Sequence, residues 1–128
     1  MRCLLDTQTF LWLAAGDERL GSRCVQAYLD TQNDSFLSIA SVWEMAIKLS
    51  VGRLTLGRPL RQLVETARKG QGIRLLPIEL EHALHVAQLP FHHRDPFDRL
   101  IVAQALVEGM TILSRDESLD RYGVQRVW

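Results

Sequence analysis

Short apolar runs alternate with longer amphipathic stretches along the 128-residue chain. The runs are uniformly hydrophobic, which is typical of strands covered on both faces of a parallel sheet. They predict strands at residues 2–5, 35–38, 73–78, 110–113 and 124–128. Apolar residues spaced three and four apart, ended by glycine or proline, predict helices between them. We expect helices at residues 7–15, 20–32, 39–51, 60–69, 80–89 and 96–108, and a short one after residue 116.

The order of these elements indicates the fold class. Helical segments separate successive strands, and parallel strands need such crossovers. We therefore expect an α/β fold with a mainly parallel sheet of about five strands and helices on both of its faces. No repeat, low-complexity tract or linker interrupts the pattern, so residues 1–128 are expected to form a single domain.

Charge and cysteine content narrow the function classes. With 15 basic and 15 acidic residues the formal net charge is zero, so a nucleic-acid partner must be bound by a local patch. We interpret Cys3 and Cys24 as two buried thiols rather than a disulfide. The start has no signal-peptide pattern and no stretch approaches membrane-spanning length, so we expect a cytoplasmic protein without a membrane partner.

Several acidic residues lie at positions that the predicted strands and helices place at one edge of the sheet. Asp6 follows the first strand, Asp116 follows the fourth, and Asp98 lies in the first turn of the helix that begins near residue 96. Functional groups gather at the carboxyl ends of parallel strands. Glu44 interrupts a largely apolar helix, and an unpaired buried carboxylate is costly unless a cation neutralises it. Oxygen ligands of this kind favour Mg²⁺, which supports phosphodiester hydrolysis.

Structural alternatives exist for each acid. Asp6, Asp95 and Asp116 each precede a predicted helix and are candidate helix caps, and Lys48 is a candidate ion-pair partner for Glu44. These roles do not exclude metal binding. The pairs His82/His85 and His92/His93 allow a zinc site as an alternative, although no cysteine or third ligand is near them in sequence.

An ordered set of motifs resembles the PIN domain, and more narrowly the VapC-type toxins of bacterial type II toxin–antitoxin systems. The resemblance runs from residue 1 to the end of the chain. It is carried by Leu4-Leu5-Asp6-Thr7 with Phe10-Leu11-Trp12, by Ser38-Ile39-Ala40-Ser41-Val42-Trp43-Glu44, by the run from Asp95-Pro96-Phe97-Asp98-Arg99 to Ala105, and by Ile112-Leu113-Ser114-Arg115-Asp116.

The resemblance implies a three-layer α/β/α sandwich and an endoribonuclease dependent on Mg²⁺ or Mn²⁺. It implies an RNA substrate such as tRNA or rRNA, a small VapB-type antitoxin partner and a homodimer. The matching catalytic and metal-binding positions are Asp6, Glu44, Asp98 and Asp116. Thr7 and Ser114 match positions that orient the ligands, and Asp95 is an additional acid.

Arg94, Arg99 and Arg115 adjoin the proposed ligands in sequence and are candidate contacts to RNA phosphates. Salt bridges that screen the acids are the alternative. The aromatic residues are expected in the core, or else in a contact with the antitoxin or a second copy: Phe10, Trp12, Trp43 and Trp128.

Two other functions remain open. One is a PIN-fold binding module without catalysis. The other is a metal-dependent phosphotransferase or phosphatase, because Leu5-Asp6-Thr7-Gln8-Thr9 is similar to the start of haloacid dehalogenases. That chemistry needs a second aspartate where Gln8 stands, which argues against it.

Overall fold

The computed structural model describes residues 1–128 and contains one five-stranded sheet, in which every pair of neighbouring strands is parallel. The strand order is β3-β2-β1-β4-β5. The central position of β1 places Asp6, the residue after it, between the ends of β2 and β4. The strands are β1 (Arg2–Leu5), β2 (Asp34–Ser38), β3 (Arg74–Leu76), β4 (Thr111–Leu113) and β5 (Arg126–Val127).

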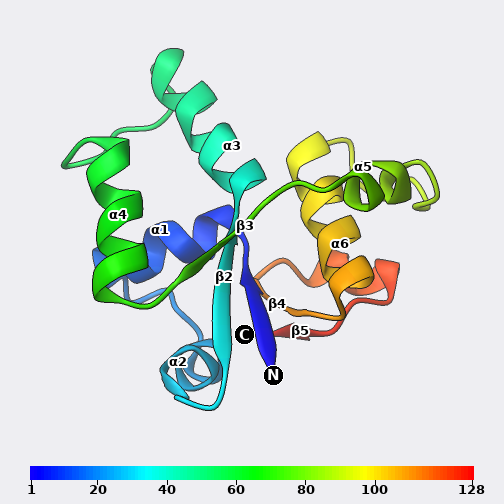
Figure 1. The fold of residues 1–128 in the computed structure, drawn as a ribbon, viewed down its shortest axis with the longest axis horizontal. Helices are drawn as coiled ribbons and strands as arrows, with labels where there is room; N and C mark the ends of the chain where they lie inside the picture. Colours follow the sequence, from blue (N-terminus) through cyan, green and yellow to red (C-terminus); the bar gives the residue numbers. More distant parts are fainter.

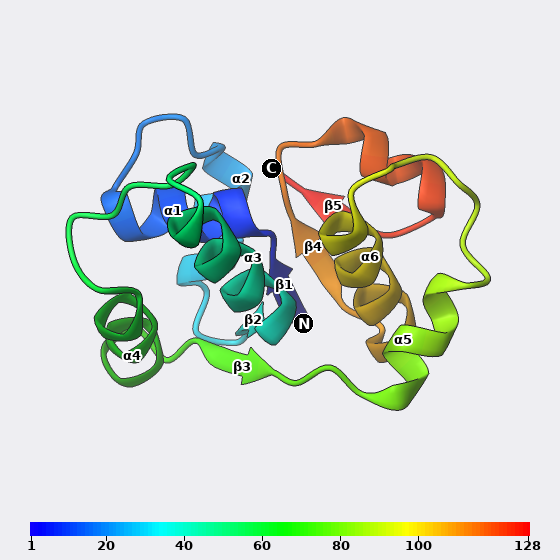
Figure 2. The same cartoon turned by 90° about the horizontal axis from the view of Figure 1, so that it is seen from above.

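Helices cover both faces of the sheet, as Figures 1 and 2 show. One layer contains α1, α2 and α4, the other contains α5 and α6, and α3 lies between α1 and α6. The predicted α/β/α sandwich with a parallel sheet is therefore confirmed. The helices are α1 (Thr7–Ala15), α2 (Ser22–Leu29), α3 (Ile39–Ser50), α4 (Leu60–Gly70), α5 (Leu80–Val86) and α6 (Pro96–Glu108), followed by a 3₁₀ helix (Glu117–Tyr122).

Alternate residues of β1 supply two separate hydrophobic cores. Cys3 and Leu5 pack into the core beneath α1, α2 and α4, whereas Leu4 packs into the core beneath α6. All three side chains are fully buried, which explains why this strand is apolar throughout. Cys3 and Cys24 are both buried free thiols, as predicted.

Most predicted elements are present, and α1 and α6 have the predicted bounds. The second helix is shorter than predicted and covers Ser22–Leu29. A Cβ atom on Gly21 would lie 2.5 Å from the carbonyl carbon of Trp128, so this position requires glycine for close approach of the chain end. The third strand is also shorter, because only Arg74–Leu76 pair with β2.

The aromatic residues divide between the core and the surface. Phe10 and Trp12 are buried, and Trp128 lies against Trp12 with ring centroids 5.7 Å apart. The core assignment is wrong for Trp43, whose side chain is 57% exposed on α3. The residue type shows that a side chain is hydrophobic, but the sequence does not show which face of a helix is covered by another element. No helix in this structure is long and apolar enough to span a membrane.

Candidate metal centre

Asp6 is held at the centre of the sheet edge by its own backbone. Its N–H donates to the carbonyl oxygen of Leu113 at 3.3 Å, which continues the pairing of β1 with β4. Its carboxylate accepts from the N–H of Thr9 at 2.8 Å and caps α1. Burial raises the pKa of Asp6. Hydrogen bonds from Ser114 and Thr9 oppose this rise, and the charge of Asp116 adds to it. The capping alternative is therefore correct, and the capping bond uses only one of the two carboxylate oxygens.

Glu44 is buried in α3, with 6% of its surface exposed. One carboxylate oxygen accepts from the hydroxyl of Thr7 at 2.7 Å, and the other lies 2.6 Å from Nζ of Lys48. The ion-pair alternative for Glu44 is thus present as well. Thr7 also lies 2.9 Å from the hydroxyl of Ser41, so these side chains hold the Glu44 carboxylate in one orientation.

Asp98 differs from the other acids because its carboxylate has no hydrogen-bond or ion-pair partner. Only its backbone N–H is engaged, donating to Asp95, which caps α6. Burial raises the pKa of Asp98 to about 7, and the nearby charges of Asp95, Glu44 and Asp6 contribute, whereas His93 opposes them. An unpaired carboxylate among like charges is a position where a cation relieves repulsion.

A cavity of about 320 Å³ brings three of the four predicted acids together: Asp6, Glu44 and Asp98 all line it. Asp116 does not line this cavity. It shares a neighbouring cavity of about 230 Å³ with Asp6, so Asp6 borders both. The predicted acids therefore gather around one side chain, although they come from four separate elements.

Asp116 follows β4 and is exposed, and one of its oxygens caps the 3₁₀ helix by accepting from the N–H of Ser118 at 3.0 Å. Burial alone would raise the pKa of Asp116, but hydrogen bonds from Ser118 and the contact with His93 outweigh it and lower the pKa. Ser114 is fully buried, and its Oγ accepts from the backbone N–H of Asp116 at 3.0 Å. Ser114 thus touches both Asp6 and Asp116.

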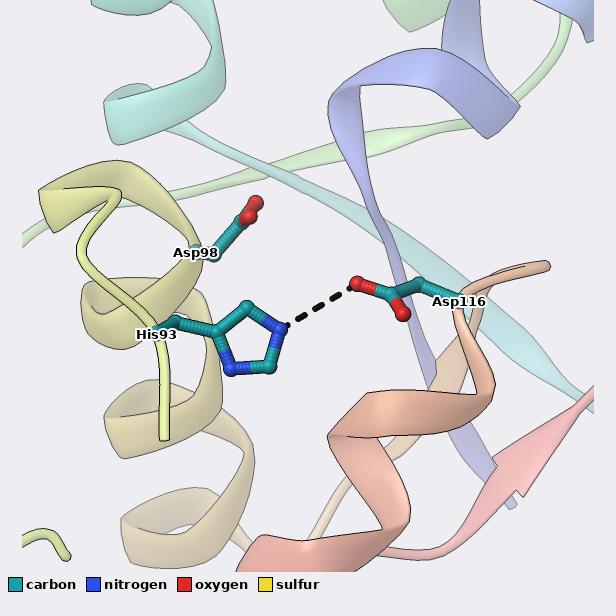
Figure 3. A group of neighbouring side chains, drawn as sticks. All are labelled: His93, Asp98 and Asp116. Carbon is teal, nitrogen blue, oxygen red and sulfur yellow. Dashed lines mark hydrogen bonds and ion pairs between the residues drawn. The ribbon is translucent and has the colours of Figure 1, made fainter. Parts of the chain in front are cut away.

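The site also contains His93, which the sequence suggested only as part of an alternative zinc site and did not connect with the acids. Figure 3 shows His93 pointing toward Asp116, with Asp98 beside it on the first turn of α6. One ligand atom from each of these three side chains lies within 4.8 Å of the others. The adjacent pair His92-His93 was visible in the sequence, but its distance from Asp116 depends on how the loop before α6 folds.

A family model of the PIN domain matches residues 3–125 of this sequence. The chain belongs to the PIN domain family. The predicted resemblance is confirmed, and PIN domains are typically metal-dependent nucleases. Comparison with curated protein sequences gives no match.

Solved structures of toxin–antitoxin systems share the fold of this PIN domain. FitAcB from Neisseria gonorrhoeae is 25% identical, over 97% of this chain and 95% of that chain, with a TM-score of 0.63. VapBC2 from Rickettsia felis, bound to a DNA fragment from its promoter, is 11% identical over the whole of both chains, with a TM-score of 0.70. VapBC-5 from Mycobacterium tuberculosis, of the VapBC family of toxin-antitoxin systems, is 15% identical over 98% and 97%, with a TM-score of 0.60. At such low identity the last two comparisons show the fold alone.

The residues of this PIN domain fit a divalent cation. The donor set consists of carboxylate oxygens and one imidazole, without a cysteine, which suits Mg²⁺ or Mn²⁺ better than a structural zinc. Asp98 supplies the carboxylate that lacks a partner, and Asp6 and Asp116 each keep one oxygen free of a helix-capping bond. A bound cation would supply the partner that the Asp98 carboxylate lacks.

The three predicted arginines lie in different environments. Arg94 and Arg115 are exposed, and Arg115 lines the cavity of about 230 Å³ together with Asp6 and Asp116. Arg99 is only 9% exposed and donates to the carbonyl oxygens of Pro90 at 2.9 Å and Val86 at 3.2 Å. Arg99 holds the loop between α5 and α6, so neither the predicted RNA contact nor the alternative salt bridge is correct for this residue. The sequence does not show which backbone carbonyl groups lie close to Arg99, so this role was not predictable.

Two further arginines lie beside Asp116. Arg23 from α2 and Arg126 from β5 line a cavity of about 660 Å³ with Arg115, Asp116 and Trp128. Arg126 already pairs with Asp120 at 2.9 Å, whereas Arg23 has no ion-pair partner. Nothing in the sequence connects Arg23 with the acids, because these residues line one cavity only after α2 packs against β5.

Proposed function

We propose that this chain is the toxin of a type II toxin–antitoxin pair and cleaves RNA as a metal-dependent endoribonuclease. The observation that carries the proposal is the partnerless carboxylate of Asp98, whose pKa is raised to about 7 by burial and by three neighbouring acids. A group of this kind, in a domain of a family of metal-dependent nucleases, is best explained by a divalent cation. The candidate cations are Mg²⁺ and Mn²⁺.

In this proposal all four acids are catalytic and provide ligand oxygens: Asp6, Glu44, Asp98 and Asp116. When bound, the cation supplies positive charge to the reacting phosphodiester and activates a water molecule. Glu44 is held by Thr7 and Lys48, so it keeps one position in the shared cavity during the reaction. We propose that Thr7 orients Glu44 and that Ser114 orients Asp116 and Asp6.

The arginines beside Asp116 provide the contact with RNA. Arg115 and Arg23 line the cavity next to the acids, so their guanidinium groups accommodate a phosphate adjoining the one that is cleaved. The net charge of the chain is zero, so this local group must provide the attraction that a basic surface would otherwise supply. We propose a cytoplasmic RNA substrate, tRNA or rRNA.

This chain has a groove beside the acids that suits an antitoxin partner. A cavity of about 630 Å³ between α1 and the loop before α4 is lined by Leu11, Trp12 and Leu56 among others. It shares Gln8, Leu11 and Leu54 with the cavity of the acids. An extended segment of a VapB-type antitoxin that fills the groove would therefore continue over the metal centre and exclude RNA.

A second copy of the chain is expected on the exposed face of α3. Four apolar residues spaced four apart are exposed along this helix and the residue after it: Ile39, Trp43, Ile47 and Val51. A contiguous apolar face of this kind marks an interaction surface, and a net charge of zero does not oppose association between copies. We propose that the chain forms a homodimer through this face.

The deciding experiment is an RNA-cleavage assay with the purified chain, total tRNA and rRNA. We expect cleavage in Mg²⁺ or Mn²⁺, loss of cleavage in EDTA, and loss in Asp6→Asn and Asp98→Asn. Each substitution removes a ligand charge without changing side-chain volume. The matched control is Asp34→Asn, because Asp34 is exposed at the start of β2, at the other edge of the sheet.

The outcomes separate the proposal from its alternatives. Cleavage at the wild-type rate by Asp6→Asn or Asp98→Asn would show that the substituted residue is not a ligand. Tight metal binding without cleavage of any RNA would support a binding module. Release of phosphate from phosphomonoesters, with intact RNA, would support a phosphatase.

A further inference from the structure

His93 has contacts on both of its ring nitrogens. It lies in the loop between α5 and α6, three residues before the start of α6. Nε2 lies 3.3 Å from a carboxylate oxygen of Asp116 and 2.9 Å from Oγ of Ser118. Nδ1 lies 3.1 Å from the hydroxyl of Tyr122. Its ring is therefore fixed from both ends, with Nε2 directed at the acids.

Tyr122 holds this ring from the side opposite the acids. Its side chain is 8% exposed, and its ring centroid lies 5.4 Å from that of His93. Metal-binding histidines generally donate their second ring N–H to an oxygen acceptor, which fixes the tautomer. When Nδ1–H donates to the Tyr122 hydroxyl, the lone pair of Nε2 points toward Asp116 and Asp98.

The carboxylates opposite Nε2 are arranged to share an ion with it. Asp116 uses one oxygen to accept from Ser118, and its other oxygen is the one that faces His93. Asp98 has no other partner, and the ligand atoms of the three residues lie within 4.8 Å of one another. Small side-chain rotations bring such atoms onto one divalent cation, whose bonds to oxygen and nitrogen are about 2.0–2.2 Å long.

We propose that His93 is a nitrogen ligand of the metal centre, and that it makes the centre bind Mn²⁺ in preference to Mg²⁺. This inference rests on the proposed function, because it adds a ligand to the same site. Mg²⁺ takes oxygen ligands almost exclusively, whereas imidazole suits transition metals. Adding one imidazole to a carboxylate set therefore favours Mn²⁺.

Mn²⁺ alone serves as the probe, because its electron spin detects a coordinated nitrogen directly. Electron spin echo envelope modulation of the Mn²⁺-loaded wild-type chain should show coupling to one imidazole ¹⁴N nucleus. The coupling should disappear in His93→Gln, which keeps a polar side chain but removes the imidazole. It should persist in His92→Gln, because His92 packs edge-on against Tyr122 but is not part of the cluster.

Titration calorimetry gives a second readout. We expect His93→Gln to weaken Mn²⁺ binding by about tenfold or more and Mg²⁺ binding by less than about threefold. Tyr122→Phe removes only the hydroxyl partner of Nδ1, so it should keep the nitrogen coupling and weaken Mn²⁺ binding by about tenfold. His92→Gln should bind both ions as the wild type does.

Failure of this inference differs from failure of the proposed function. If the wild type binds Mn²⁺ and cleaves RNA without any ¹⁴N coupling, or if the coupling survives in His93→Gln, His93 is not a ligand and the nuclease proposal stands. Equal weakening of Mn²⁺ and Mg²⁺ in His93→Gln would overturn the preference for Mn²⁺. If the wild type binds neither ion, both proposals fail.

Discussion

At the scale of single residues, the surroundings of Asp98 disfavour its charged carboxylate, first through burial and then through the charges of Asp95, Glu44 and Asp6. The folded chain holds a proton on this carboxyl up to a pKa of about 7, against an ordinary value of 3.8. Between about pH 4 and pH 7 the folded state therefore binds more protons than the unfolded state. Stability without metal accordingly falls as pH rises through that window and then levels off.

Asp98→Asn removes the charge that burial and the neighbouring acids destabilise. In EDTA, we expect the variant to exceed the wild type in free energy of unfolding by about 1–2 kcal/mol at pH 7.5, after allowance for solvent screening. The difference should shrink toward pH 4.5, where the wild-type carboxyl is protonated in the folded state. Urea denaturation at both pH values measures it. Asp34→Asn should show no such pH-dependent gain, and a less stable Asp98→Asn at pH 7.5 would contradict the electrostatic account.

Asp6 combines a helix cap with a proposed ligand, and two substitutions separate these roles. Asparagine caps helices as well as aspartate does, whereas alanine leaves the N–H of Thr9 without its partner. We expect Asp6→Ala to be about 1 kcal/mol less stable than Asp6→Asn, while both lose RNA cleavage. Thermal melts in EDTA measure the first effect, and identical melting of the two variants would refute the capping role.

At the scale of elements, a buried polar group joins α6 to the sheet. Gln104 is fully buried on α6, accepts from the hydroxyl of Ser38 at 2.5 Å and donates to the carbonyl oxygen of Pro77 at 3.2 Å. These contacts tie α6 to the end of β2 and to the segment after β3. They hold the first turn of α6, which carries Asp98, relative to the sheet.

Gln104→Leu should lower the free energy of unfolding by about 1–3 kcal/mol, because the buried hydroxyl of Ser38 loses its acceptor and the carbonyl oxygen of Pro77 loses a donor. Chemical denaturation measures this loss. Gln62→Leu, on the exposed side of α4, should change stability by less than about 0.5 kcal/mol. A Gln104→Leu variant as stable as the wild type would show that the contacts do not hold α6.

The exposed apolar face of α3 leads to a prediction about homodimer formation. Trp43 is 57% exposed and contacts only the edge of Phe97 among aromatic rings, with centroids 5.2 Å apart. Trp43→Ser should shift the chain from dimer to monomer while the melting temperature of the monomer is kept. Analytical ultracentrifugation over a range of concentrations measures the shift, and a wild type that stays monomeric at high concentration would refute the homodimer.

At the scale of the whole molecule, the metal joins segments that are distant in sequence. Asp6, Asp98 and Asp116 lie in three parts of the chain that are distant in sequence, so a cation that binds them stabilises only the folded chain. At a hundredfold excess over its Kd the ion adds about 2.7 kcal/mol, which raises the melting temperature by about 10 °C. Differential scanning calorimetry with and without Mn²⁺ should show this rise in the wild type and Asp34→Asn, and little rise in Asp98→Asn.

The elements and their order were predictable because their causes are local. Hydrophobic periodicity and the residues that end helices predicted α1 and α6 with the observed bounds, and the parallel sheet followed from the alternation. The ordered motifs identified the family, and they predicted the four acids as the catalytic and metal-binding set. Nearby residues in sequence carry all of this information.

Only the tertiary structure decided which side chains meet across the chain. It placed Asp98 among like charges without a partner, brought His93 to Asp116, and buried Arg99 against backbone carbonyl groups. It also exposed Trp43, although its residue type predicts burial. Each of these outcomes depends on contacts between residues far apart in sequence, because burial and charge are properties of the surroundings and not of the residue alone.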